Sequence, residues 1–162
     1  MIKKILFSLL LILLLLQIFR PKQDNIAKIA SPANINNSFT VPADIDQNLK
    51  QSCYDCHSNK TTYPWYYQVQ PVGWWLDDHI KEGKKELNFD EFGTYSLRRQ
   101  YKKLEEIGEM VDKEEMPLTS YTLIHQNAKI SLEQKRQMVS WTDQLLNEMR
   151  SKYPVDSLIR KK

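Results

Sequence analysis

The chain has two cysteines, and both lie in the run Cys53-Tyr54-Asp55-Cys56-His57. Two thiols that are separated by two residues and followed by a histidine could serve a redox disulfide, a metal site or covalent attachment of haem. Haem attachment uses all three groups, because the thiols add to the porphyrin as thioethers and the imidazole coordinates the iron. We therefore expect Cys53 and Cys56 to attach one haem and His57 to be an axial ligand.

The other uses of the two thiols explain less of the sequence. A thioredoxin-type oxidoreductase needs a β-strand before its Cys-x-x-Cys pair, and the sequence has almost no strand-like alternation. A structural zinc site generally takes its four ligands from two separated pairs, whereas the other two histidines, His79 and His125, have no paired partner. A disulfide between Cys53 and Cys56 would close a very small loop and stabilise little. A disulfide with a purely structural role is nevertheless the simplest alternative to haem attachment.

A haem used for electron transfer usually has a second axial ligand, either a methionine sulfur or a second histidine. We favour Met116, because Pro117 disfavours a helical conformation at the residue before it and so places Met116 in a loop. Met138 and Met149 fall in the last predicted helix, where core packing is the simpler role. The remaining candidates are Met110, His79, His125 or an open sixth site.

Residues 1–20 differ from the rest of the chain. Lys3 and Lys4 precede an apolar run of 15 residues from Ile5 to Phe19, which is typical of an export signal. The run is shorter than the ~20 residues of a membrane-spanning helix, but it lacks the small residues that a signal peptidase recognises. We expect a hydrophobic helix that is a signal peptide or an uncleaved membrane anchor. The body would lie on the periplasmic side of the inner membrane, anchored there or released after cleavage.

The composition divides the rest of the chain into three parts. Residues 21–42 are rich in proline, asparagine and serine and are expected to be a linker. Residues 43–152 follow helical periodicity and form the expected haem-binding domain, and residues 153–162 form a basic tail. The predicted fold class is therefore all-α, with one small domain. Its four helices with long connections make a thin core that a haem would fill.

The predicted helices have recognisable boundary signals. Asp44 is expected to cap the first of them. Ser131 and Gln134 form a capping box at the start of the last. The other two are expected over residues 72–85 and 96–111, where apolar residues recur at helical spacing.

The charge of the chain argues against a nucleic-acid partner. There are 23 basic and 20 acidic residues, and Lys3, Lys4, Arg20 and the basic tail account for the basic excess. The body is thus near neutral and lacks the clustered positive charge that nucleic-acid binding needs.

Four segments of the body resemble a known family. They are VPADIDQNLKQSCYDCHSN, YPWYYQVQPVGWWLDDHIKEGKKELNF, EEIGEMVDKEEMPLTSY and a final helix with an SW dipeptide. Over residues 39–150 the chain resembles the haem-binding domain family of exported bacterial proteins, which is related to cytochrome c. The resemblance implies a cytochrome c-like helical fold around one covalently attached haem c. It also implies that Cys53 and Cys56 are the attachment points and that His57 and Met116 hold the iron.

The function expected from these observations is electron transfer between redox partner proteins through a His/Met-ligated haem. Such a carrier makes no bonds in a substrate and is not an enzyme. The alternative is a haem-based sensor of small ligands or a peroxidase-like enzyme, either of which needs an open or labile sixth site. The aromatic runs 63–67 and 74–75 are expected to wall the haem pocket, and a sugar or peptide platform is their alternative role.

Overall fold

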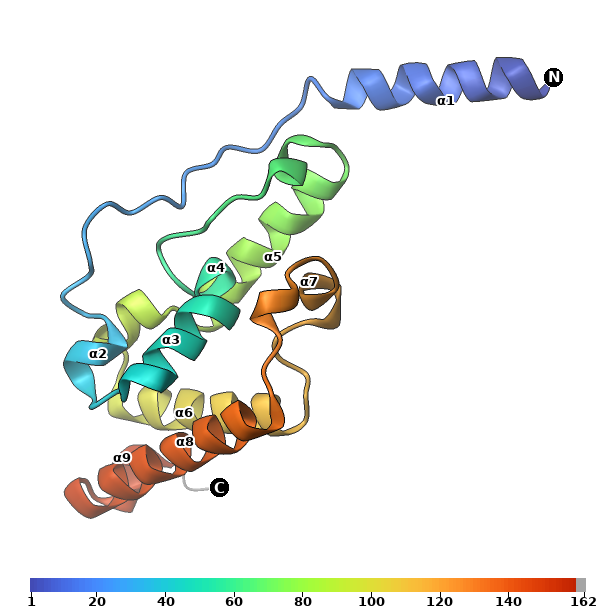
Figure 1. The fold of residues 1–162 in the computed structure, drawn as a ribbon. Helices are drawn as coiled ribbons and strands as arrows, with labels where there is room; N and C mark the ends of the chain where they lie inside the picture. Colours follow the sequence, from blue (N-terminus) through green and yellow to red (C-terminus); the bar gives the residue numbers. More distant parts are fainter. Residues whose placement is uncertain (160–162) are drawn as a thin grey trace.

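The computed structural model describes residues 1–159, so that Arg160, Lys161 and Lys162 of the predicted basic tail lie outside the described part. Within it the chain is one all-α domain, as the sequence predicts, and forms no β-strand. Figure 1 shows the body helices gathered together, with α1 extending away from them. The elements are α1 (Ile2–Leu16), α2 (Ile35–Ser38), α3 (Ala43–Ser52), α4 (Tyr54–His57), η1 (Trp65–Gln68), α5 (Val72–Glu86), η2 (Phe89–Thr94), α6 (Leu97–Asp112), α7 (Thr119–Ile124), η3 (Gln126–Ala128), α8 (Leu132–Lys152) and α9 (Val155–Leu158).

Most helix boundaries follow from local signals. The predicted capping box starts α8: the Ser131 hydroxyl accepts from the Gln134 backbone, and the Gln134 side chain accepts from the Ser131 backbone. Ser96 caps α6 with its side chain. The predicted cap at Asp44 is wrong, because α3 begins at Ala43 and its N-cap residue is Pro42. Asp44 lies instead in the first turn, where its negative charge complements the helix dipole.

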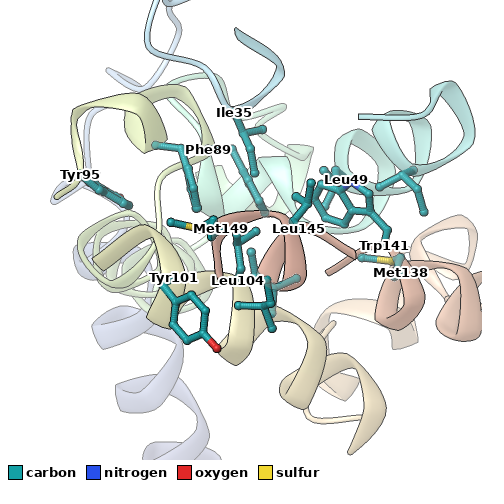
Figure 2. Packing of buried hydrophobic residues seen from close by; sticks show 14 of the residues in the cluster. Ile35, Leu49, Phe89, Tyr95, Tyr101, Leu104, Met138, Trp141, Leu145 and Met149 are labelled. Carbon is teal, nitrogen blue, oxygen red and sulfur yellow. The ribbon is translucent and has the colours of Figure 1, made fainter. Parts of the chain in front are cut away.

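The main core lies between α6 and α8 (Figure 2). Leu104 of α6 is buried with Met138 and Leu145 of α8. The two helices approach closely at Gly108, where a Cβ atom would lie 2.5 Å from the Thr142 hydroxyl oxygen. The long amphipathic α6 and α8 therefore form the support against which the shorter elements pack.

The short turn η2 completes this core from the side of the cysteines. Phe89 and Phe92 of η2 are fully buried. Phe89 also stacks on Tyr54, with ring centroids 5.2 Å apart. The sequence does not predict η2, because six residues are too few to show a periodic spacing of apolar side chains.

A second, smaller hydrophobic cluster lies beneath α5. Leu76 and Ile80 of α5 bury their side chains against Tyr67 of η1, and Tyr63 and Cys56 pack at the edge of the cluster. Because Cys56 belongs to this cluster, α5 and the cysteine segment are held together by apolar contact.

Both segments that flank the expected domain contribute to the main core. Ile35 of α2, within the segment expected to be a linker, has 0% of its surface exposed. Leu158 of α9, within the expected tail, is also buried. Ile35 stands between polar neighbours, and the apolar residues Val155 and Leu158 span a single turn. Neither segment is long enough to give a periodic signal of a buried side chain.

Residues 20–27, here called the strap, run along the body after α1. Ile26 forms an isolated antiparallel bridge with Lys60. The buried Asn25 amide donates to the Ser58 carbonyl and to the Thr61 hydroxyl at 2.9 and 2.8 Å. The strap is therefore tied to the loop that directly follows the cysteine segment.

No side chain of α1 is buried. Its end is nevertheless fixed to the body, because Gln17 exchanges hydrogen bonds of 2.9 and 3.0 Å with the Gln70 backbone. The indole of Trp74 donates to the Phe19 carbonyl at 2.7 Å. Of the helices that residues 1–159 form, none is both long enough and apolar enough to cross a membrane.

The burial of Ile35 leads to a prediction about stability. Replacing this fully buried side chain in Ile35→Ala should lower the free energy of unfolding by about 2–5 kcal/mol, since it leaves a cavity between α2 and η2. Ile29→Ala, in the same segment but with 86% of its surface exposed, should change it by less than about 0.5 kcal/mol. Urea unfolding followed by circular dichroism measures both, and equal effects would contradict the packing of α2 on the core.

Candidate functional site

The Cys53–His57 segment forms one helical turn of its own. After α3 ends at Ser52, the backbone NH groups of Cys56 and His57 both donate to the Cys53 carbonyl, at 3.2 and 2.9 Å. The side chains of Cys53, Cys56 and His57 are half-buried. The turn thus brings both thiols and the imidazole to one place, as the sequence spacing predicts.

The imidazole of His57 is oriented by two backbone carbonyls. Its Nδ1 atom donates to the carbonyl oxygens of Gly83 and Leu87 at 2.9 and 3.0 Å, at the end of α5. Burial lowers the pKa of His57, although these two hydrogen bonds oppose the change. Because a carbonyl oxygen can only accept, Nδ1 carries a proton. The lowered pKa favours the neutral ring, in which Nε2 then has the lone pair. This is the arrangement that histidine ligands of metals adopt, with the second nitrogen held by a carbonyl.

Gly83 allows the cysteine turn to lie directly on α5. A Cβ atom at this position would lie 2.8 Å from the Cys56 carbonyl oxygen and 3.2 Å from the Cys56 Cβ atom. Only a residue without a side chain fits at such a distance. The contact brings the carbonyl of Gly83 within reach of His57.

The two cysteines are free thiols. Burial raises the pKa of Cys53 to about 12 and that of Cys56 to about 11. Redox-active cysteines have lowered pKa values, because the thiolate is the reactive form. The surroundings of these thiols therefore do not favour a thioredoxin-type reaction.

Two adjoining cavities meet at the cysteine turn. Their volumes are about 360 Å³ and 230 Å³. Five residues line both of them: Ser52, Cys53, His57, Glu86 and Met116. The residues that line only the larger cavity include Cys56, His79 and Tyr121, and those that line only the smaller one include Phe89, Ile107 and Met110.

The groups that line these cavities fit a haem. A largely apolar space suits the macrocycle, two thiols can form its thioether bonds, and a neutral imidazole and a thioether can hold iron. Within residues 1–159, no three His, Cys, Asp or Glu side chains come together as a site for a bare metal ion.

Met116 lies where a sixth ligand could be, in the loop between α6 and α7. It is half-buried and lines both cavities. Met110, at the end of α6, also lines the smaller cavity. From the sequence, a role of Met110 at the site could not be distinguished from ordinary core packing. Met138 and Met149 are buried in the main core. Two of the four internal methionines therefore lie at the site.

The two other histidines differ in their relation to the cavity. His79 lines the larger cavity, and its Nδ1 hydrogen-bonds to the Trp75 carbonyl at 2.8 Å. His125 lines neither cavity and hydrogen-bonds to the Tyr66 hydroxyl at 2.6 Å. It also stacks on Tyr121, with ring centroids 4.3 Å apart. Only His79 is placed to approach a group bound in the cavity.

Tyr121 is a site residue that sequence reasoning missed. Its hydroxyl donates to the Asp55 carboxylate at 2.7 Å, joining α7 to the middle of the cysteine turn. Burial and this hydrogen bond both raise the pKa of Tyr121. The contact joins residues 66 positions apart, and no local pattern in the sequence indicates it.

The aromatic runs lie elsewhere than predicted. None of the rings in residues 63–67 and 74–75 lines either cavity, so the prediction that they wall the pocket is wrong. Tyr67 is buried beneath α5, whereas Trp65 has 80% of its surface exposed. Gly83 lies near the C-terminal end of α5, whereas the aromatic runs surround its N-terminal end. Trp75 reaches the cavity wall only indirectly, through His79 at the middle of the helix, with ring centroids 4.2 Å apart.

The chain was compared with known proteins and families. The family model described as a haem-binding domain matches residues 11–144. No curated protein and no solved structure matches the chain. The match extends over far more than half of the sequence and includes the cysteine turn, α5 and Met116. The chain belongs to the haem-binding domain family.

Proposed function

We propose that the protein is an exported electron carrier with one haem c, attached through Cys53 and Cys56 and held by His57 and Met116. One observation carries the proposal: these four side chains line one cavity of about 360 Å³. When bound there, the haem would supply the one-electron chemistry. The protein residues would fix its position and set its potential.

The contacts of His57 support its role as the proximal ligand. The carbonyls of Gly83 and Leu87 hold Nδ1, which leaves Nε2 for the iron and fixes the plane of the ring. Hydrogen bonding at Nδ1 also makes Nε2 a stronger donor. A ligand that does not reorient between ferrous and ferric states suits electron transfer.

Met116 is the proposed sixth ligand because it lines both cavities from a loop that is not committed to a helix face. Thioether ligation and an apolar surrounding both favour the ferrous state and a higher potential. Leu118 and Pro117 flank the sulfur on the wall of the larger cavity, and they would limit access of water to the iron.

A second candidate function is a small-ligand sensor or a peroxidase-like enzyme. The observation that favours it is His79 in the wall of the larger cavity, where the hydrogen bond of Nδ1 to Trp75 leaves Nε2 available. This function would need Met116 to be absent from the iron or easily displaced. A low-spin ferric spectrum supports the carrier, and a high-spin ferric spectrum supports this alternative.

The proposed location is the periplasmic side of the inner membrane. The apolar residues of α1 after Lys3 and Lys4 support export, and the fact that none of them is buried supports contact with lipid. Redox partner proteins would approach on the open side of the cavity, where Asp78 and Glu82 are exposed.

The proposal predicts which methionine the spectrum depends on. In Met116→Ala, the methionine–iron charge-transfer band of the ferric protein should disappear while the haem stays attached, because the thioether ligand is lost. Met110→Ala is the matched control, since Met110 lines the smaller cavity but is not a proposed ligand. Optical spectra of the two variants test this. Loss of the band in Met110→Ala and its retention in Met116→Ala would mean that Met110 is the iron ligand.

Covalent attachment is tested by mass spectrometry under denaturing conditions. The wild type, made in a host that assembles c-type cytochromes, should carry the mass of one haem. Cys53→Ser and Cys56→Ser together should remove it, because both thioether bonds are lost. Ser58→Ala, next to the turn, should retain the haem. A colourless wild type with free or mutually bonded thiols would refute the proposal.

The close contact at Gly83 gives a test that leaves every proposed ligand in place. Gly83→Val would force the Cys56 backbone away from α5 and draw His57 from its two carbonyls. We expect it to lose most of its haem. Lys85→Val places the same residue on an exposed position of α5 and controls for the lower helix propensity of valine. Equal haem content per chain in the two variants, measured by absorbance, would contradict this role of Gly83.

A further inference from the structure

We propose that the surface formed by Trp65, Val69, Val72, Trp74 and Trp75, here called the aromatic corner, binds the lipid interface and holds the haem-binding domain in a fixed orientation on the membrane. These side chains of η1 and the start of α5 are all partly or largely exposed, and Trp65 is the most exposed of the tryptophans. They belong to neither cavity at the cysteine turn. The inference rests on the proposed membrane location and adds a contact surface to it.

The aromatic corner is continuous with α1. Gln17, at the end of α1, is hydrogen-bonded in both directions to the backbone of Gln70. Two residues later, the Phe19 carbonyl accepts a hydrogen bond from the indole of Trp74. Figure 1 shows the end of α1 directly beside the turn that leads into α5. Whatever surrounds the end of α1 must therefore also reach the corner.

The surroundings of α1 can be inferred from its own surface. After Lys3 and Lys4 the residues of the helix are apolar except for Ser8, and none is buried by the rest of the protein. A helix of this kind is stable in lipid and not in water. With α1 embedded in a bilayer, the hydrogen bonds at Gln17 and Phe19 place Trp74 at the depth where hydrocarbon meets headgroups.

Tryptophan is well suited to this depth. Its ring is apolar and its indole NH is a donor, so that tryptophans are enriched at membrane–water interfaces. The three exposed tryptophans lie in the corner, and the fourth, Trp141, is buried in the main core. The exposed cations Arg20 and Lys22 follow α1 directly and can meet anionic headgroups.

The strap makes the connection between membrane and domain stiff. The Lys22 carbonyl lies 3.1 Å from the Tyr67 hydroxyl, whose one proton also has the Asp77 carboxylate as an acceptor at 2.9 Å. The Asn25 side chain is hydrogen-bonded within the body. The chain is thus fixed at residues 17, 19 and 25 as it leaves α1. A flexible tether would let the domain rotate, whereas these contacts give it one orientation.

The orientation sets the height of the haem site above the lipid. Trp74 and Gly83 belong to the same helix, α5, and are nine residues apart. At about 1.5 Å of rise per residue, the carbonyl that holds His57 lies ~13 Å along the helix from the corner. The site would therefore face partners that are themselves held close to the membrane.

The test measures the depth of single positions in the full-length haem-loaded protein. Gln68→Cys places a thiol on the exposed side of η1 without removing a tryptophan, and Val155→Cys places one on α9, far from α1 in Figure 1. Each is spin-labelled and bound to vesicles of phosphatidylethanolamine and phosphatidylglycerol. Relaxation by oxygen, which concentrates in lipid, is compared with relaxation by a water-soluble nickel chelate. Mass spectrometry verifies one label per chain.

We expect the oxygen-to-nickel ratio to be several-fold higher at position 68 than at position 155. In a background of Trp65→Ser and Trp75→Ser, the ratio at position 68 should fall to that at 155. Equal ratios in the unmodified background would overturn the proposal. So would shielding of position 68 from both reagents together with a doubled mass in light scattering, which would mean that a second copy covers the corner.

A third label, in Ile12→Cys, separates this inference from the proposed membrane location. If position 12 is in lipid and position 68 is in water, the membrane location stands and the aromatic corner does not bind lipid. If position 12 is in water as well, the membrane location itself is wrong and the inference fails with it. Haem binding is read independently from the absorbance of the same samples.

Discussion

The hydrogen bonds from Nδ1 of His57 to the carbonyls of Gly83 and Leu87 are the constraint on which the site depends. α5 ends at this point, and the Leu87 carbonyl just beyond its last turn is one that the helix itself leaves without a partner. The Gly83 carbonyl accepts from the Leu87 backbone NH at 2.9 Å as well as from the imidazole. The imidazole completes the helix end, and the helix end fixes the imidazole. Stability and ligand geometry are thus provided by the same contact, and the missing side chain of Gly83 is what allows it.

The cysteine turn also joins two parts of the protein that would otherwise be separate. Cys53 and Tyr54 pack against the main core, whereas Cys56 packs against the smaller cluster beneath α5. The two cavities lie at this junction. A haem bound there, as proposed, would contact both hydrophobic clusters, so that cofactor binding and the association of the two clusters would reinforce each other.

The sequence predicted those parts of the fold that have a long period or a specific local signal. The all-α class, α5, α6 and the capped start of α8 followed from apolar spacing and from Ser131. The grouping of Cys53, Cys56 and His57 followed from their adjacency, and the loop position of Met116 from Pro117. What depends on contacts between distant residues could not be predicted. The hydrogen bond from Tyr121 to Asp55 joins α7 to the turn, and Ile35 reaches the core from a polar segment.

The aromatic runs show a different limit of sequence reasoning. Composition indicated that rings gather in residues 63–67 and 74–75, but an α-helix separates its two ends by its length. Trp74 lies at the beginning of α5 and Gly83 near its end. The exposed tryptophans at the start of α5 therefore line neither cavity, although Tyr63 and Tyr66 pack against the same cluster as Cys56.

The pairing of the strap with the loop after the cysteine turn has a consequence for the order of folding. Residues 25–27 are synthesised before the turn, yet the residues to which they bond, 58–61, come directly after it. The N-terminal segment cannot take up its final place until the whole cysteine motif has been made. Closure of the strap can therefore only follow synthesis of the cysteine motif, and it holds in place the loop that comes directly after that motif.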